Sequence, residues 1–161
     1  MPELLIVYHS RTGGSRQMAA AALEAASAEG PARLLETTQA HPQDLLDASG
    51  YLFCAPENLA TLSGAMKEFF DRCYYPVLGQ IEGRPYAQMI CAGSDGEGAA
   101  RQLARIATGW RLREVQPPLI VCTHAQTPEA ILADKVIAPD DLTRCAELGA
   151  ALGAGLAMGA F

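Results

Sequence analysis

The chain has 161 residues and a formal net charge of −6; half of its residues are hydrophobic and 19% are charged. This composition fits one globular domain over residues 1–161 and excludes a disordered chain. The acidic balance gives no electrostatic reason to expect nucleic acid or an anionic membrane as a partner.

Five short apolar runs alternate with helix-forming stretches along the chain. A continuous apolar run predicts a strand that is covered on both faces. The predicted strands are Leu4–Tyr8, Ala32–Glu36, Tyr51–Ala55, Tyr86–Ala92 and Leu119–Cys122. We read no basic, cleavable leader before the first strand and no apolar run long enough for a membrane span, so we expect a cytoplasmic protein.

Helices are predicted between these strands from alanine content and from apolar residues spaced three or four apart. They are expected over Arg16–Ala28, Ser63–Cys73, Leu103–Trp110 and from Asp140 onward, with a short helix beginning at Thr127-Pro128-Glu129. Regular alternation predicts a three-layer α/β/α sandwich around a five-stranded parallel sheet of order 2-1-3-4-5.

Cysteines and small residues carry less specific information. The five cysteines have no paired spacing, which predicts buried free thiols rather than disulfides or a metal site. They are Cys54, Cys73, Cys91, Cys122 and Cys145. The Ala- and Gly-rich tail from Cys145 to Phe161 predicts a buried final helix with close neighbours. The alternative is a surface where a second subunit packs closely in a homo-oligomer.

In an open parallel sheet, ligands bind beyond the carboxyl ends of the strands, where the strand order reverses. In the predicted order that point lies between the first and third strands. The candidate site therefore consists of the residues that follow Tyr8, Ala55 and Ala92.

The loop after the first strand reads Ser10-Arg11-Thr12-Gly13-Gly14-Ser15. Three hydroxyls and two glycines before a helix favour a phosphate site, because such a turn presents N–H groups at the positive end of the helix dipole. The alternative is a capped strand-to-helix turn. GxxxxGK[ST] is absent and GxGxxG does not follow this strand. The cysteine of a low-molecular-weight tyrosine phosphatase and the acidic pair of a receiver domain are also missing here.

Two segments resemble a known superfamily. Ser10–Ser15 is similar to the [ST]-x-T-G-x-[ST] loop of flavodoxin-like flavoproteins. Pro56–Arg72 resembles NAD(P)H-dependent FMN reductases and quinone reductases, in which a proline-led loop precedes a G-x-[ML]-K-x-[FA]-[LF]-D helix; here that helix begins at Gly64. The resemblance implies a flavodoxin-like fold, flavin mononucleotide (FMN) as cofactor and NAD(P)H as co-substrate.

The resemblance also assigns the three loops to parts of FMN. The phosphate would be held by Ser10, Arg11, Thr12, Gly13, Gly14 and Ser15. The ring would be lined by Pro56, Glu57, Asn58, Leu59 and Ala60, and its other edge closed by Gly93, Ser94, Asp95 and Gly96. No catalytic side chain is predicted, because the cofactor itself carries hydride transfer.

Neither ring loop contains Trp, Tyr or Phe, whereas electron-carrying flavodoxins usually sandwich the ring between aromatic side chains. An uncovered ring leaves room for a nicotinamide or quinone, so we predict an oxidoreductase that reduces a quinone, a flavin or another small acceptor. The alternatives are a flavodoxin-type electron-transfer protein and a flavodoxin-fold binding module without FMN. The aromatic-Asn-Gly continuation common in the reductases is also absent, which predicts weak FMN affinity.

Five ionisable side chains at or near these loops are read individually. Arg11 is expected either to bind a phosphate, of the flavin or of the nicotinamide cofactor, or to point into solvent. His9 is read as a satisfied buried histidine rather than a proton donor. Glu57 and Asp95 are read as lying near the ring or in solvent, and His124 as reaching the ring only if its loop folds back.

Overall fold

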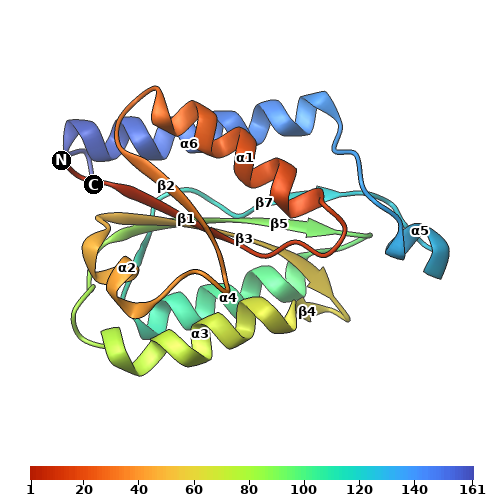
Figure 1. Cartoon of the computed structure of the whole chain (residues 1–161), viewed down its shortest axis with the longest axis horizontal. Helices are drawn as coiled ribbons and strands as arrows, with labels where there is room; N and C mark the ends of the chain where they lie inside the picture. Colours follow the sequence, from red (N-terminus) through yellow and green to blue (C-terminus); the bar gives the residue numbers. More distant parts are fainter.

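The computed structural model describes residues 1–161 as a central sheet between two layers of helices (Figure 1). Five strands are parallel, in the order β2-β1-β3-β5-β7. They are β1 (Leu4–Tyr8), β2 (Ala32–Glu36), β3 (Gly50–Asn58), β5 (Pro85–Ala92) and β7 (Leu119–Cys122). The predicted three-layer flavodoxin-like sandwich and its 2-1-3-4-5 order are confirmed.

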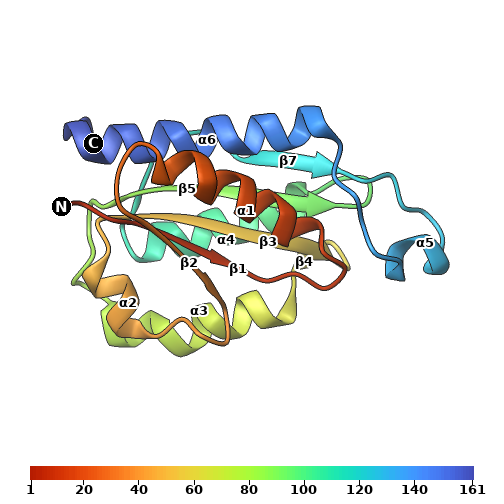
Figure 2. The same cartoon turned by 45° about the horizontal axis from the view of Figure 1, so that its top comes forward.

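Helices α1 (Gly14–Ser27) and α6 (Pro139–Met158) cover one face of the sheet, and α3 (Gly64–Val77) and α4 (Glu97–Gly109) cover the other (Figures 1 and 2). The alternation of each strand divides the core accordingly. Leu5, Val7 and Phe53 belong to the core under α3 and α4, while Leu4 and Ile6 belong to the core under α1 and α6. None of the helices is both long and apolar enough to cross a membrane.

Close helix packing explains the small residues of α6. A Cβ on Gly149 would meet the backbone of Ala22 in α1, and one on Gly153 would meet the backbone of Ala26. These contacts confirm the prediction of a buried final helix with close neighbours. The same glycines are thereby used within the chain and do not argue for a second subunit.

The observed elements differ from the predicted ones mainly at their ends. Helix α1 begins at Gly14, two residues earlier than predicted, so Gly14 and Ser15 form its first turn. Helix α3 continues to Val77 through Tyr74, whose ring stacks on the buried Trp110 at a centroid distance of 5.7 Å. The predicted end at Cys73 is therefore wrong, because tertiary contact with Trp110 extends the helix.

Four short elements complete the fold. Helix α5 was predicted from Thr127, whose side chain accepts a hydrogen bond from the Ala130 N–H; the other three were not predicted. The four are α2 (Pro42–Asp47), β4 (Thr61–Leu62), β6 (Arg113–Glu114) and α5 (Pro128–Leu132). Strand β6 pairs with β5 beside its start, and β7 pairs with β5 near its end.

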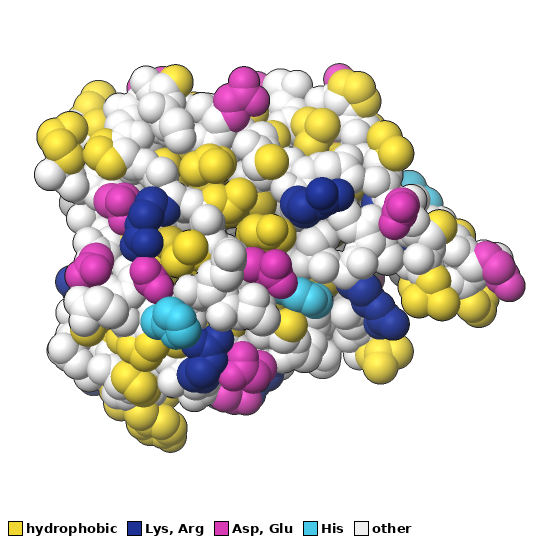
Figure 3. All heavy atoms as spheres, viewed as in Figure 1, with side chains coloured by type: hydrophobic (Ala, Val, Ile, Leu, Met, Phe, Trp, Pro, Cys, Tyr) yellow, Lys and Arg dark blue, Asp and Glu magenta, His cyan; other side chains and the backbone are white.

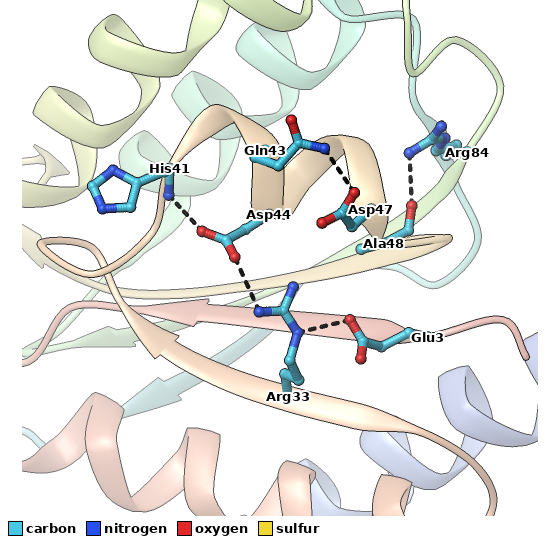
Figure 4. Close-up of polar contacts among 8 residues, drawn as sticks. All are labelled: Glu3, Arg33, His41, Gln43, Asp44, Asp47, Ala48 and Arg84. Atoms are coloured by element: carbon cyan, nitrogen blue, oxygen red, sulfur yellow. Dashed lines mark hydrogen bonds and ion pairs between the residues drawn. The ribbon is translucent and has the colours of Figure 1, made fainter.

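A polar network fixes α2 beside the beginnings of β1 and β2 (Figure 4). The Arg33 guanidinium donates to Glu3 at 2.7 Å and to Asp44 at 3.0 Å. The Arg84 guanidinium donates to the carbonyl of Ala48 at 2.6 Å, beyond the end of α2. These charges are satisfied within the fold and stand at the amino edge of the sheet, away from the candidate loops.

Candidate functional site

The three predicted loops meet at the carboxyl edge of β1, β3 and β5, because neighbouring parallel strands end at the same edge. The first loop closes as a tight turn in which the Gly13 N–H donates to Ser10 Oγ at 3.0 Å. Gly13 precedes α1 with φ +94°, a backbone conformation that glycine adopts without strain. We call residues Ser10–Ser15 the phosphate loop.

The first turn of α1 provides donors that the protein does not use. The N–H groups of Gly14, Ser15 and Arg16 have no acceptor in the chain. Ser15 is only 2% exposed, and its Oγ has no hydrogen-bond partner. A buried hydroxyl without a partner carries an energetic cost unless a ligand satisfies it.

Gly14 brings the backbone close to β5. A Cβ at this position would lie 2.6 Å from the Sγ of Cys91, so a larger residue would have to displace that side chain or the turn. Cys91 is itself buried, and burial raises the pKa of its thiol to about 11, which keeps it protonated and uncharged at neutral pH. The orphaned Ser15 hydroxyl and the free N–H groups at the start of α1 fit a phosphate group.

The second segment is a β-hairpin rather than a loop. Pro56, Glu57 and Asn58 belong to β3, and Glu57 and Asn58 pair with Leu62 and Thr61 of β4. The prediction that this strand ends at Ala55, before Pro56, is wrong. Proline cannot donate a backbone hydrogen bond, but the Pro56 carbonyl accepts the Ser63 N–H at 3.2 Å. Strand β3 therefore continues past Pro56.

Leu59 and Ala60 form the two-residue turn of this hairpin. Their φ angles are +53° and +67°, as in a type I′ turn, where Asn-Gly is the preferred pair. A non-glycine residue at such angles is strained. Leu59 is 99% exposed, so it points away from the core at the tip of the hairpin.

Glu57 joins the hairpin to the third loop. Its carboxylate accepts the Gly96 N–H at 2.9 Å and the Ala99 N–H at 3.0 Å, and so caps the start of α4. From the sequence, Glu57 is expected near the ring or in solvent; the structure places its carboxylate on the start of α4. Sequence spacing gives no signal for this cap, because 39 residues separate Glu57 from Gly96.

The third loop, Gly93–Gly96, lies beside the chain that follows β7. The His124 N–H donates to the carbonyl of Gly93 at 2.8 Å, while Ser94 and Asp95 are exposed. Gly96 has φ +89°, and a Cβ there would lie 2.5 Å from the Ile120 side chain. Neither the hairpin turn nor this loop carries an aromatic residue.

His9 links the phosphate loop to the hairpin. Its Nδ1 lies 2.8 Å from the hydroxyl of the buried Ser63, as expected for a satisfied histidine. Burial lowers the pKa of His9, the positive charge of Arg11 lowers it further, and Glu36 acts in the opposite direction. The imidazole is therefore neutral at pH 7.

A family model described as NADPH-dependent FMN reductase matches residues 25–127. The chain belongs to this family. The matched range contains the hairpin and the Gly93–Gly96 loop of this FMN reductase family member, and it begins after the phosphate loop.

Individual relatives agree with the family assignment. A flavodoxin of Aquifex aeolicus is 34% identical over 100 residues, which are 61% of this chain and 54% of that protein, so the match spans about half of the relative. An archaeal flavodoxin superposes with a TM-score of 0.77 at 15% identity, covering 96% of this chain and 98% of that one.

A flavodoxin, WrbA-like protein from Agrobacterium tumefaciens superposes with a TM-score of 0.74 at 18% identity and covers 99% of both chains. At such identities these two solved structures show the fold of this FMN reductase family member and nothing finer.

Proposed function

We propose that this chain binds FMN at the carboxyl edge of β1, β3 and β5 and uses NAD(P)H to reduce a small acceptor such as a quinone or a free flavin. The observation that carries the proposal is Ser15, a buried hydroxyl without a partner beside three unused N–H groups on the first turn of α1. FMN, when bound, would supply the hydride transfer.

The residues of this chain would orient the cofactor. The first turn of α1 would hold the phosphate through Gly14, Ser15 and Arg16 N–H groups, aided by the helix dipole. The Pro56–Ala60 hairpin and the Gly93–Gly96 loop would border the ring with backbone groups. The bonds from Glu57 to α4 hold these two segments at a fixed separation, which favours a preorganised site.

The absence of aromatic side chains from both ring segments supports a reductase over a carrier, because an uncovered ring face leaves space for a stacking substrate. The second candidate is an electron-transfer protein that passes electrons to another protein. The Aquifex aeolicus flavodoxin relative favours it, and the two candidates differ in whether a small acceptor suffices.

The first experiment mixes the purified protein with FMN, removes the excess and records the visible absorption spectrum. We expect a retained and shifted flavin band, and saturable quenching of FMN fluorescence in titration. A colourless protein without saturable quenching would overturn the flavin assignment and leave the third alternative, a binding module.

The second experiment measures oxidation of NADPH and NADH by the FMN-loaded protein with and without a quinone. The control is free FMN at the same concentration. Oxidation faster than the control and dependent on the quinone supports the reductase. Bound FMN without such turnover refutes it in favour of the electron-transfer protein.

A further inference from the structure

The side chain of Gln17 in α1 joins two distant parts of the chain. Its Nε2 donates to the carbonyl of Gly13 at 2.9 Å and to that of Lys135 at 2.7 Å, and its Oε1 accepts the Ile137 N–H at 3.0 Å. Both donors and the acceptor of the amide are therefore used. Lys135 and Ile137 lie 118 and 120 residues further along the chain. One side chain thus ties the phosphate loop to the connection between α5 and α6.

A second hydrogen bond joins the same two segments. The Lys135 N–H donates to the carbonyl of Thr12 at 2.8 Å. The other end of the Thr12–Gly13 peptide group is also fixed, since the Gly13 N–H donates to Ser10 Oγ at 3.0 Å. Because the Ser10 hydroxyl accepts this bond, its own hydrogen stays available for a ligand. The connection therefore fixes the orientation of this peptide group and leaves a hydroxyl donor free.

The next peptide group, between Gly13 and Gly14, is oriented in the same way. In a planar trans peptide the N–H points opposite to the C=O. The Gly13 carbonyl accepts both the Gln17 side chain and the Gln17 backbone N–H, the latter at 3.1 Å. The Gly14 N–H therefore points out from the beginning of α1. It is the first of the three N–H groups of this turn that have no acceptor in the chain.

The connection between α5 and α6 lies directly against the first turn of α1. A Cβ on Gly14 would be 3.5 Å from Ile137 Cδ1 and 3.7 Å from Lys135 Cβ. Figures 1 and 2 show the chain between α5 and α6 passing the beginning of α1. Ile137 is buried in the core under α1 and α6. Its side chain therefore gives the hydrogen bonds of Gln17 a fixed anchor.

Helix α5 does not hold the connection in place by packing. None of its residues is buried, and Ile131 and Leu132 are exposed. Figure 3 shows this part of the chain projecting at the right edge of the face seen in Figure 1, with hydrophobic side chains on its surface. The Lys135 ammonium donates to the carbonyls of Ala130 and Ile131 at the end of α5. The connection is therefore held by its hydrogen bonds to α1 and to the phosphate loop rather than by packing of α5.

We propose that Gln17 is a positioning residue for the phosphate of FMN. Through its bonds to the phosphate loop and to the connection after α5, it keeps the donors of Gly14 and Ser10 oriented toward that group. Gln17 uses all of its own hydrogen-bonding groups within the chain and has none left for the phosphate. The loop is thereby preorganised before the ligand binds. This inference rests on the proposed function and deepens it, because it names a residue by which the site distinguishes FMN from riboflavin, which lacks the phosphate.

The test compares the dissociation constants of FMN and riboflavin, by fluorescence titration, in the wild type and two variants. Gln17→Met keeps a side chain of similar length and removes its three hydrogen bonds. Gln102→Met is the matched control, because the half-buried Gln102 side chain also makes a long-range bond, in which it accepts the Leu62 N–H of β4 at 2.7 Å. We expect Gln17→Met to weaken FMN binding about tenfold or more and riboflavin binding less than about threefold. Gln102→Met should change both alike, so the ratio of the two affinities stays that of the wild type.

Three outcomes would overturn the positioning role. The same ratio of FMN to riboflavin affinity in Gln17→Met and in the wild type would make Gln17 a structural residue only. An equal fall of this ratio in Gln102→Met would mean that general loosening of the fold is responsible. Equal affinity of the wild type for the two flavins would show that the loop does not bind the phosphate, while flavin binding itself would stand.

Hydrogen exchange of the wild type gives a second measurement that does not depend on a folded variant. Coupling between two sites is reciprocal, so a connection that favours phosphate binding is itself stabilised by the phosphate. Saturating FMN should slow exchange of the Lys135 and Ile137 N–H groups about threefold or more relative to saturating riboflavin. Equal exchange rates with the two flavins would contradict the proposal.

A wild-type protein that binds neither flavin would refute the proposed function. Titration with inorganic phosphate, followed by NMR of the Gly14 and Ser15 amides, would then decide about Gln17. Saturable shifts whose midpoint rises about tenfold in Gln17→Met would support the positioning role. An unchanged midpoint in the variant, or no shifts in the wild type, would refute it.

Discussion

The carboxylate of Glu57 bonds the N–H of Gly96 at 2.9 Å, so the segment after β3 caps the helix that follows β5. This single contact couples the two segments proposed to border the ring. A second carboxylate oxygen bonds the Ala99 N–H, which satisfies two of the orphan donors at the start of α4. The cap thus serves both the stability of α4 and the spacing of the proposed site.

Replacing Glu57 with alanine should lower the free energy of unfolding by about 1–2 kcal/mol, the usual cost of losing a helix cap and its charge. FMN affinity should fall as well, because the hairpin and the Gly93–Gly96 loop lose their common anchor. Urea unfolding and FMN titration measure the two effects. The control Glu97→Ala removes an exposed carboxylate from the same helix turn. An equal loss of unfolding free energy in that variant would mean that negative charge near the start of α4, and not the hydrogen bonds of Glu57, stabilises the helix.

The strained turn of the hairpin gives a prediction of opposite sign. Exchanging Leu59-Ala60 for Asn-Gly supplies residues that accept positive φ, so the protein should gain about 1 kcal/mol or more in unfolding free energy. Ala20→Gly, at an exposed position inside α1, should instead destabilise by about 1 kcal/mol. A destabilised Asn-Gly variant in thermal or urea unfolding would mean that the turn is not strained.

The sequence predicts those parts of the fold whose signals are local. The apolar run Leu4–Tyr8 is sufficient to indicate a buried parallel strand, and the alternation of such runs with helices leads to the observed strand order. The hairpin turn at Leu59-Ala60 is different, since neither residue favours positive φ. Pairing of β3 with β4 and the close approach of Ala60 to Gly98 impose that conformation.

The candidate site is predictable to a similar extent. Hydroxyls and glycines after β1 indicate a phosphate loop, and the structure adds the orphaned Ser15 hydroxyl. The hydrogen bond from the Lys135 N–H to the Thr12 carbonyl has no local signal, because it joins the connection after α5 to the loop after β1 across the fold. Such contacts come from tertiary packing, which single-sequence patterns do not encode.

The packing of α6 on α1 predicts a steric effect. Gly149→Ala places a methyl group against the Ala22 backbone and should destabilise the protein by about 1–3 kcal/mol through overpacking. Gly64→Ala is the matched control, since nothing lies within 4 Å of a Cβ at that helical position. Urea unfolding of both variants checks the prediction. Equal stabilities would contradict the close approach of the two helices.

His9 makes stability depend on pH. Because burial lowers its pKa in the folded state, the unfolded chain binds more protons near its ordinary pKa of 6.5, and the folded state loses stability as the pH falls through and below that value. Above that range the effect vanishes. We expect the difference in unfolding free energy between pH 8 and pH 5 to be smaller in His9→Gln than in the wild type. An unaltered His9→Gln profile would refute the assignment.

Ser15 separates a ligand-binding role from a structural one. In the FMN-free protein its buried Oγ has no partner, so Ser15→Ala should leave the unfolding free energy unchanged or raise it by about 1 kcal/mol or more. FMN affinity should fall about tenfold or more, because a hydrogen bond to a charged phosphate contributes about 1.5–3 kcal/mol. Ser27→Ala, at the exposed end of the same helix, is the control and should affect neither quantity. Urea unfolding without FMN and fluorescence titration with FMN provide the two measurements. A Ser15→Ala variant that loses stability but keeps its FMN affinity would mean that the hydroxyl serves the fold, and that the phosphate is held elsewhere.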